Sequence, residues 1–246
     1  MTPPGQPIFS TDLYLPRYRA MRAGDWEIKI AEMALVPSYW GTPTMTTDLV
    51  SLIRGRETWM SISPLEIESA EIGIRLARGH VLIFGLGMGW AAAATAMHDA
   101  VTHVTIVERD REILELHRML DLFAQLPEPN RSKIHIVEGD ALTYRPDHPV
   151  DLLMPDIWLP LVSDGRVDEV RAMQANVGAK SLYFWGQELE IARHASAAGQ
   201  ELDSTGIAAT IAGFDLPLVG LEWPDYPALV GAAASRWMRG RWLSGA

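Results

Sequence analysis

From residue 80 onward, short runs of consecutive apolar residues alternate with longer segments whose apolar positions recur at helical spacing. The runs are VLIF at 81–84, VTIV at 104–107, IHIV at 134–137, DLLM at 151–154 and SLYFW at 181–185. Continuous apolar strands separated by helices are typical of a parallel sheet that is buried on both faces. The repeated strand–helix units therefore predict an α/β fold with a doubly wound, mainly parallel sheet.

The chain before residue 64 has a different pattern. Residues 1–25 are rich in proline and arginine, which predicts an extended arm. The segments WEIKIAEMAL (26–35) and LVSLIRGRETWMSIS (49–63) partly alternate between apolar and polar positions and are rich in strand formers. They predict a small N-terminal β-hairpin or meander that extends the main sheet domain.

A helix start joins these two parts. Ser63 can cap a helix, Pro64 suits the first helical position, and Glu66 completes a capping box. After about residue 200 the strand–helix alternation weakens: TGIAATIAGF and ALVGAAASRWMRGRWL are expected to be helices, and the final antiparallel strand pair of many related folds is not found. We therefore divide the chain into an arm with a β extension (1–63), an α/β domain (64–200) and a helical C-terminal extension (201–246).

Composition narrows the class of partner. The formal net charge of −10 repels phosphate backbones, so no nucleic-acid partner is expected. The absence of cysteine excludes thiolate chemistry, and the seven histidines show no metal-binding spacing, so no metal is predicted. No apolar run approaches the roughly 20 residues that span a bilayer, and the N-terminus does not resemble a signal peptide. A cytoplasmic protein with no membrane partner is expected.

A glycine-rich turn follows the first predicted strand of the α/β domain. The segment VLIF-GLGMGW places Gly85, Gly87 and Gly89 between that strand and a helix. Glycine has no Cβ, so the backbone can turn tightly here and approach a ligand closely. In doubly wound sheets, ligands bind outside the carboxyl ends of the strands, where this turn lies. The turn is a candidate ligand site, although glycines also occur in purely structural strand-to-helix turns.

The spacing of the glycines distinguishes between nucleotide classes. The dinucleotide fingerprint G-x-G-x-x-G needs a third glycine where this chain has Trp90. The pattern here is G-x-G-x-G, which resembles the first motif of the Rossmann-like S-adenosylmethionine-dependent methyltransferases. The resemblance covers about residues 65–185 and implies S-adenosyl-L-methionine as the cofactor.

The same resemblance assigns two acidic residues to the adenosine. Glu108 ends the second strand, where the family's carboxylate accepts both ribose hydroxyls; otherwise it is a charge at a helix start, although Asp110 already fills that role. Asp140, with Ala141 beside it, follows the third strand, where the family's aspartate accepts the exocyclic amine of adenine; otherwise it is a solvent-facing turn residue.

Chemistry is expected after the fourth and fifth strands. Asp156 follows the fourth strand and is the candidate catalytic residue, as a general base or an acceptor of the substrate's proton. Its alternative is a capping or loop aspartate. Trp158, Trp185 and Gln187 are the candidate substrate-binding residues, because each follows a strand's carboxyl end. The tryptophans could equally pack under loops or at the interface of a homodimer.

Resemblance to subfamilies is partial. The N-terminal strands followed by a helix resemble spermidine synthases, which transfer an aminopropyl group, but Leu159 stands where those enzymes carry a second aspartate. The Asn/Asp-Pro-Pro-aromatic tetrad of amino-methylating relatives is absent, since the order here is Pro155-Asp156-Ile157-Trp158. The leading hypothesis is a methyltransferase acting on a small-molecule acceptor. An aminopropyl transferase and a non-catalytic S-adenosylmethionine-binding protein remain the alternatives.

Overall fold

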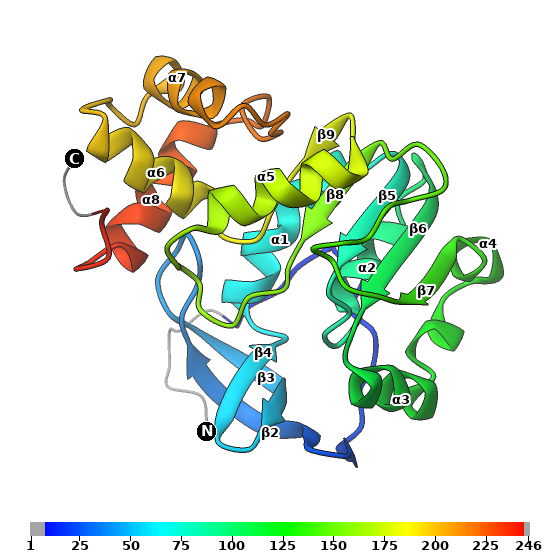
Figure 1. Cartoon of the computed structure of the whole chain (residues 1–246). Coiled ribbons are helices and arrows are strands. Elements are labelled where there is room, and N and C mark those ends of the chain that lie inside the picture. The colour runs from blue at the N-terminus through cyan, green and yellow to red at the C-terminus, as the bar shows by residue number, and fades with distance from the viewer. Residues whose placement is uncertain (1–7, 244–246) are drawn as a thin grey trace.

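The computed structural model of the chain describes residues 8–243. The first seven residues of the predicted arm and the last three residues of the chain lie outside the described residues. Two sheets organise the molecule: a small antiparallel sheet near the N-terminus and a parallel sheet flanked by helices (Figure 1). A group of helices from the C-terminal third lies beside the parallel sheet, away from its β7 edge (Figure 1).

The N-terminal sheet is a four-stranded antiparallel meander in the order β1-β2-β3-β4. Strands β2 and β3 are long and pair from Trp26↔Arg54 to Val36↔Thr44, while β1 pairs only with the start of β2. The predicted strand at 49–63 therefore forms the end of β3, a tight turn and β4. The strands are β1 (Met21–Ala23), β2 (Trp26–Val36), β3 (Thr44–Arg54) and β4 (Glu57–Ser61).

The second sheet has five strands in the order β7-β6-β5-β8-β9, and every neighbouring pair is parallel. The strand order reverses between β5 and β8. The chain first adds β6 and β7 on one side of β5, and it then returns to add β8 and β9 on the other side. This arrangement confirms the predicted doubly wound, mainly parallel fold. The strands are β5 (Gly79–Phe84), β6 (Val101–Glu108), β7 (Ile134–Glu138), β8 (Leu152–Pro155) and β9 (Ser181–Leu182).

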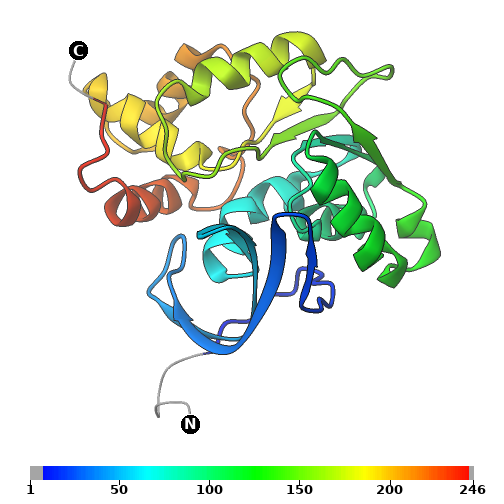
Figure 2. The same ribbon diagram turned by 60° about the horizontal axis from the view of Figure 1, so that its bottom comes forward.

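Helices cover both faces of this sheet. Figures 1 and 2 show α1 and α2 on one side of the strands and α5 on the other. The apolar strands β5, β6 and β8 are buried as predicted, and Val81, Leu82 and Phe84 have no exposed surface, but the edge strand β7 is exposed or half-buried along its length. The helices of this part are α1 (Pro64–Leu76), α2 (Trp90–Ala96), α3 (Arg111–Leu120), the 3-10 helix η1 (Leu122–Gln125), α4 (Glu128–Arg131) and α5 (Arg166–Val177).

The C-terminal third is helical, as expected. It comprises α6 (Gln187–Ala197), α7 (Ser204–Phe214) and α8 (Tyr226–Trp237), with α6 packed against both others. Between α7 and α8 the chain passes along β9: the N–H of Leu182 donates to Pro217 O (2.9 Å) and the N–H of Val219 donates to Leu182 O (2.9 Å). None of the described helices is both long and apolar enough to cross a membrane.

Two local predictions at element ends need correction. The fifth strand of the main sheet is predicted over 181–185 but ends at Leu182, because a turn closed by Gly186 in the left-handed region (φ 78°) begins α6. Helix α1 begins at Pro64 as predicted, yet the Ser63 side chain makes no capping hydrogen bond. The predicted capping box is therefore wrong, and its Glu66 lines a cavity instead.

Candidate functional site

A cavity of about 220 Å³ lies at the carboxyl edge of the parallel sheet, on both sides of the point where the strand order reverses. Its floor is the glycine turn that follows β5 and the ends of β6 and β8. Helix α1 forms one wall, and residues of β2, β3 and β4 close the cavity from the side of the N-terminal sheet. Figure 2 shows that sheet facing the helices and strands that carry the rest of the site.

The glycine turn adopts a backbone that other residues rarely accept. Gly85, Gly87 and Gly89 have φ values of +93°, +48° and +76°, all in the left-handed region. A Cβ on Gly87 would lie 2.4 Å from the sulfur of Met60, and one on Gly89 would lie 2.6 Å from the ring of His117. All three glycines line the cavity. The sequence thus places glycine where the turn needs positive φ and close packing at once.

Three side chains from distant segments hold this turn in place. His117 of α3 lies 2.9 Å from Gly87 O through its Nε2, and burial lowers the pKa of His117 to about 4. The neutral ring therefore donates its Nε2 proton to the carbonyl. Tyr18 donates to Met88 O (3.0 Å), and the N–H of Met88 donates to the sulfur of Met60 on β4 (3.1 Å). The shape of the turn is thus set before any ligand arrives.

Glu108 lies at the end of β6 and bridges two backbone segments. Its Oε2 accepts the N–H of Leu86 in the glycine turn (3.0 Å), and its Oε1 accepts the N–H of Asp110 (2.7 Å). The residue is half-buried and lines the cavity. Both carboxylate oxygens are therefore fixed in position, and each keeps lone-pair capacity for a further donor.

Asp140 and Ala141 lie beyond the end of β7, on the same cavity. Asp140 is exposed, and its Oδ1 accepts the N–H of Leu142 (2.9 Å), which holds the carboxylate in a tight turn. Ala141 is buried beside it. Since β6 and β7 are neighbours with Glu108 paired to Glu138, the residues that follow the two strands reach the cavity together.

Asp156 follows β8 and lies close enough to Glu66 of α1 for its charge to affect that residue. Both residues line the cavity. Asp156 is open to the cavity, but protein surrounds it, and this burial raises the pKa of Asp156 to about 6, while the positive charge of Arg166 opposes the shift. Burial raises the pKa of Glu66 well above its usual range; the nearby charge of Asp156 adds to this, and a hydrogen bond with the Ser61 backbone opposes it.

The N-terminal sheet is hydrogen-bonded to the segment that joins β6 to α3. The indole N–H of Trp26 on β2 donates to Asp110 Oδ2 (2.9 Å), and Asp110 caps α3 by accepting the N–H of Glu112 (2.9 Å). Arg54 on β3 lies 3.6 Å from the same Asp110 oxygen and 5.2 Å from the centre of the Trp26 ring. Trp26, Arg54 and Trp59 line the cavity, so this sheet contributes directly to its surface.

The loop between β2 and β3 is attached to α1. Glu68 of α1 accepts the backbone N–H groups of Tyr39 (2.7 Å) and Trp40 (3.0 Å) and the hydroxyl of Ser38 (2.6 Å) through one carboxylate oxygen. The sheet is therefore held against the α/β part at both of its ends, through Asp110 and through Glu68.

The three residues predicted to contact substrate fall into two groups. Trp158 and Trp185 line the cavity, and the indole N–H of Trp185 donates to Ser69 Oγ on α1 (2.9 Å). Gln187 does not line it: its side chain is fully buried, and its amide donates to Val219 O (2.7 Å) and to the Tyr226 hydroxyl (2.9 Å). The structure thus corrects the prediction for Gln187, which ties α6 to the C-terminal segment.

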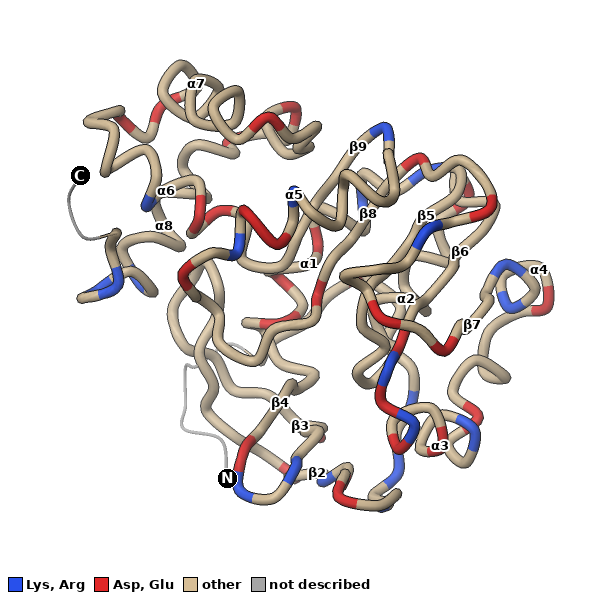
Figure 3. The backbone as a smooth tube through the Cα atoms, in the orientation of Figure 1, with Lys and Arg blue, Asp and Glu red and all other residues tan. Residues whose placement is uncertain are grey.

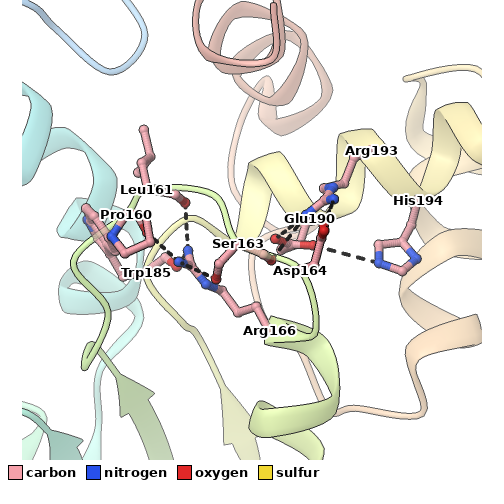
Figure 4. A network of polar contacts seen from close by, with 9 residues as sticks. All are labelled: Pro160, Leu161, Ser163, Asp164, Arg166, Trp185, Glu190, Arg193 and His194. Carbon is pink, nitrogen blue, oxygen red and sulfur yellow. Dashed lines mark hydrogen bonds and ion pairs between the residues drawn. The ribbon is translucent and has the colours of Figure 1, made fainter. Parts of the chain in front are cut away.

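A fully buried arginine fixes the loop between β8 and α5. Arg166 donates to the carbonyl oxygens of Leu161 (2.6 Å), Trp185 (3.2 Å) and Pro160, and its Nη2 lies 3.2 Å from Ser163 Oγ (Figure 4). Its guanidinium lies 4.6 Å from the ring centre of Trp158 and 5.6 Å from that of Trp185. The loop that starts at Asp156 is therefore held by the guanidinium of Arg166, which lies over the rings of Trp158 and Trp185.

A second buried arginine continues this network. Arg193 donates to Ser163 O (3.2 Å) and pairs with Asp164 and with Glu190 (3.3 Å), and Figure 4 shows these groups converging. His194 Nε2 lies 3.7 Å from the other Glu190 oxygen, as expected for residues at i and i+4. Burial raises the pKa of Glu190, and the charges of Arg193 and Arg166 oppose the shift. Helix α6 thereby anchors the same loop from its far end.

A buried carboxyl with three tyrosines lies behind the cavity. The carboxyl oxygens of Glu188 lie 3.0, 2.9 and 3.1 Å from the hydroxyls of Tyr39, Tyr183 and Tyr226. Burial raises the pKa of Glu188 to about 7, although these hydrogen bonds oppose the shift. The Tyr183 hydroxyl is also 3.0 Å from Ser69 O. Its single proton cannot serve two acceptors, so the geometry fits a protonated Glu188 that donates to Tyr183.

Charged residues of both signs are spread along the chain. Figure 3 shows acidic and basic positions interspersed over the strands, helices and loops. Within residues 8–243, no three histidine or acidic side chains gather in a way that would hold a metal ion. Acidic residues outnumber basic ones in the cavity lining, where Glu66, Glu108, Asp110, Asp140 and Asp156 lie together with Arg54 and Arg109.

Sequence reasoning missed part of the site. Glu66 has the spacing of a capping box, so its sequence pattern concealed its position in the cavity wall. Its neighbours Ser69 and Ala70 at i+3 and i+4 share that face of α1 and also line the cavity. The residues of the N-terminal sheet lie far from the glycine turn in sequence, and no spacing rule brings them to it.

Comparisons with known proteins give matches among solved structures alone. No protein-family model matches the chain, and no curated protein matches it. The chain is similar to the glycopeptide N-methyltransferase MtfA complexed with S-adenosyl-L-homocysteine, at 22% identity and a TM-score of 0.34 over 44% of this chain and 41% of that one. It is also similar to a DhpI–SAM–HEP complex, at 22% identity and a TM-score of 0.31 over 44% and 45% of the two chains.

A third similar structure is the methyltransferase domain of bacterial CtHen1-CN, at 19% identity and a TM-score of 0.30 over 39% of this chain and 48% of that one. This chain therefore covers less than half the length of each of the three structures. Two of these proteins are named as methyltransferases, the class that the sequence motifs resemble. The fold of the present chain is defined by its own strand order and glycine turn.

Proposed function

We propose that this chain is an S-adenosylmethionine-dependent methyltransferase that acts on a small-molecule acceptor. One observation carries the proposal: a single cavity collects the glycine turn, Glu108, Asp140 and Asp156. Each follows the carboxyl end of a different parallel strand, on either side of the point where the strand order reverses. Ligands of doubly wound sheets bind at that place.

The residues present fit the adenosine and methionine parts of this cofactor. Glu108 would accept the ribose hydroxyls, since a carboxylate has about four lone-pair sites and backbone groups occupy only two of them here. Asp140, with the buried Ala141 beside it, would accept the amine of adenine. The turn at Gly85, Gly87 and Gly89 would take the methionine end, because all three glycines line the cavity and their backbone can approach a ligand closely.

Trp90 argues against a dinucleotide. In the dinucleotide turn, a third glycine at this position allows the helix to approach the strand closely. Here the first residue of α2 is a buried tryptophan that lines the cavity. Its indole occupies space that the dinucleotide fingerprint leaves open.

When bound, the cofactor supplies a methyl group on a positively charged sulfur, so the protein must orient the acceptor and remove its proton. Asp156 would take that proton: it lines the cavity, and its raised pKa of about 6 is close to neutral pH, which suits a general base. Trp158 and Trp185 would enclose the acceptor and exclude water. The loop that carries Trp158 is held by Arg166, which keeps this wall in place.

A thermal-shift comparison tests the cofactor. S-adenosyl-L-homocysteine at a concentration about 100-fold above its Kd should stabilise the chain by about 2.7 kcal/mol, whereas NAD should not. Stabilisation by NAD without stabilisation by S-adenosyl-L-homocysteine would overturn the proposal. Transfer is tested with methyl-labelled S-adenosylmethionine and a metabolite extract. Label should move to a small molecule with the wild-type chain but not with Asp156→Asn, and equal labelling by both would remove Asp156 from the chemistry.

An aminopropyl transferase is the second candidate, favoured by the N-terminal sheet that contributes Trp26, Arg54 and Trp59 to the cavity. Leu159 disfavours it, because a second aspartate is expected at that position in spermidine synthases. Calorimetry separates the two. A methyltransferase should bind S-adenosyl-L-homocysteine more tightly than methylthioadenosine, and an aminopropyl transferase should show the reverse order and turn over decarboxylated S-adenosylmethionine.

A further inference from the structure

Two carboxyl groups share one wall of the cavity and lack side-chain partners. Glu66 comes from the first turn of α1 and Asp156 from the residue after β8, and both line the cavity. Glu66 is only 9% exposed. Across residues 8–243, no side chain donates a hydrogen bond to either carboxyl group. Asp156 opens onto the cavity, and Glu66 is buried with a hydrogen bond to the Ser61 backbone, so both carboxyl groups keep acceptor sites for a ligand in the cavity.

A nearby cation, Arg166, makes no hydrogen bond to either carboxyl group. It lies close enough for its charge to affect Asp156, but its Nε has no hydrogen-bond partner among the described residues. Both Nη atoms are directed to the carbonyl oxygens of the loop, of Trp185 and to Ser163 Oγ. Its guanidinium is stacked on Trp158 and Trp185. Glu66 hydrogen-bonds with the Ser61 backbone, but within residues 8–243 a ligand would have to displace no side-chain donor from either carboxyl group.

The rest of this wall is apolar and aromatic. Met154, Tyr183 and Trp185 line the cavity together with Glu66 and Asp156. The hydroxyl of Tyr183 and the indole N–H of Trp185 both bond to Ser69, so the polar atoms of these two lining residues are already engaged. Such a surface suits a compact cation attached to an apolar body, because the rings attract positive charge and cover carbon.

We propose that Glu66 and Asp156 together bind the ammonium group of the acceptor, so that the substrate is a small primary amine with an apolar or aromatic body. The proposal rests on the proposed function and names the substrate class of that site. An ammonium group has three N–H donors and one positive charge, which can satisfy two carboxyl groups that line the same cavity. An acceptor with a hydroxyl group offers one donor and no charge. An acceptor with a carboxylate would be repelled by the two acidic side chains.

The chemistry balances with these residues. Asp156 takes one proton from the ammonium group, which leaves a neutral amine with a lone pair on nitrogen. That pair forms the new N–C bond to the methyl carbon while the C–S bond breaks and its electrons stay on sulfur. The product is a methylammonium ion that still carries one positive charge. Glu66 holds the nitrogen throughout and needs no proton transfer.

Binding to the full-length chain saturated with S-adenosyl-L-homocysteine tests this proposal without turnover. Primary amines from ethylamine to benzylamine are titrated by calorimetry, each beside the alcohol of the same carbon skeleton. At least one amine should bind about tenfold or more tightly than its alcohol, since a charge-assisted pair adds upward of one kcal/mol in such a site. Equal affinity of every amine and its alcohol, or no binding by any amine, overturns the proposal.

Variants separate the pair from the rest of the site. Glu66→Gln and Asp156→Asn should each weaken amine binding about tenfold, while Glu66→Asp should retain part of it. Asp99→Asn, in the turn before β6 at the opposite edge of the sheet, should bind amines as the wild type does. Unchanged S-adenosyl-L-homocysteine affinity shows that each variant is folded. Unchanged amine affinity in Glu66→Gln overturns the amine proposal alone, whereas failure of the wild type to bind S-adenosyl-L-homocysteine overturns the proposed function.

Discussion

The backbone carbonyl oxygen of Asp156 lies where a side chain on Gly85 would begin: a Cβ atom on Gly85 would be 2.1 Å from that oxygen. The contact arises because β5 and β8 are parallel neighbours, with the N–H of Asp156 donating to Phe84 O (2.8 Å). The backbones of Gly85 and Asp156 are therefore in direct contact, so a displacement of one should also displace the other.

Substitution of Gly85 by alanine should disrupt both parts of the site. The change places a Cβ against a backbone oxygen and imposes φ +93° on an L-residue, so the free energy of unfolding should fall by about 3 kcal/mol or more. Gly231→Ala is the matched control, because its Cβ would meet nothing within 4 Å in the middle of α8. That variant should be neutral or more stable by up to about 1 kcal/mol. Urea unfolding measures both, and an equal loss in the two variants would contradict the assigned role of the turn.

Glu108→Ala should weaken binding of S-adenosyl-L-homocysteine about 10- to 100-fold, because the ribose hydroxyls lose a fixed charged acceptor. The N–H groups of Leu86 and Asp110 lose their partner as well, which loosens the glycine turn. Glu138→Ala is the control: Glu138 ends the neighbouring strand directly opposite Glu108, but its carboxylate is half-exposed and pairs with Arg111 on the surface. Calorimetry should find its affinity unchanged. If both variants bind alike, Glu108 does not hold the ribose.

The main sheet could be predicted because its pattern is local. A strand buried on both faces must be apolar at consecutive positions, so VLIF at 81–84 and VTIV at 104–107 indicate their own burial. The glycine spacing is also a local property, since it reflects the φ values at Gly85, Gly87 and Gly89. Asp110 was expected to start α3 and does so, because N-cap chemistry involves only neighbours in sequence.

Residues whose roles depend on long-range packing could not be predicted. Gln187 follows a predicted strand end, but β9 stops at Leu182 and the intervening turn directs Gln187 into the interior, where Tyr226 from α8 meets it. Glu66 has the sequence spacing of a capping box, yet it lies close enough to Asp156, 90 residues away in sequence, to be affected by its charge. In both cases the deciding partner comes from a distant segment whose position follows only from the assembled fold.

Stability should depend on pH through Glu188. Its pKa is raised in the folded chain, from 4.5 to about 7, so the folded state holds a proton that the unfolded state has released. The proton on Glu188 therefore stabilises the folded state fully below about pH 4.5. This stabilisation is lost as pH rises through 7, which lowers the free energy of unfolding by about 3 kcal/mol. Glu188→Gln, which keeps the shape but cannot ionise, should lack this decline. Urea unfolding from pH 4.5 to 8 compares the two chains, and parallel curves would mean that Glu188 is ionised in the folded state.

His117 should produce a pH dependence of the opposite sign. Burial lowers its pKa from 6.5 to about 4, so the unfolded state binds a proton that the folded state excludes. The neutral ring of His117 therefore stabilises the folded state fully above pH 6.5. As pH falls toward 4 this stabilisation is lost, and the free energy of unfolding falls by about 3 kcal/mol. Because the neutral ring donates to Gly87 O, acid should loosen the glycine turn before the whole chain unfolds, and S-adenosyl-L-homocysteine affinity should fall over the same range. His117→Gln retains an N–H donor without a titrating ring and should keep its affinity at pH 5. If wild-type affinity at pH 5 equals that at pH 7, the turn does not depend on the neutral ring of His117.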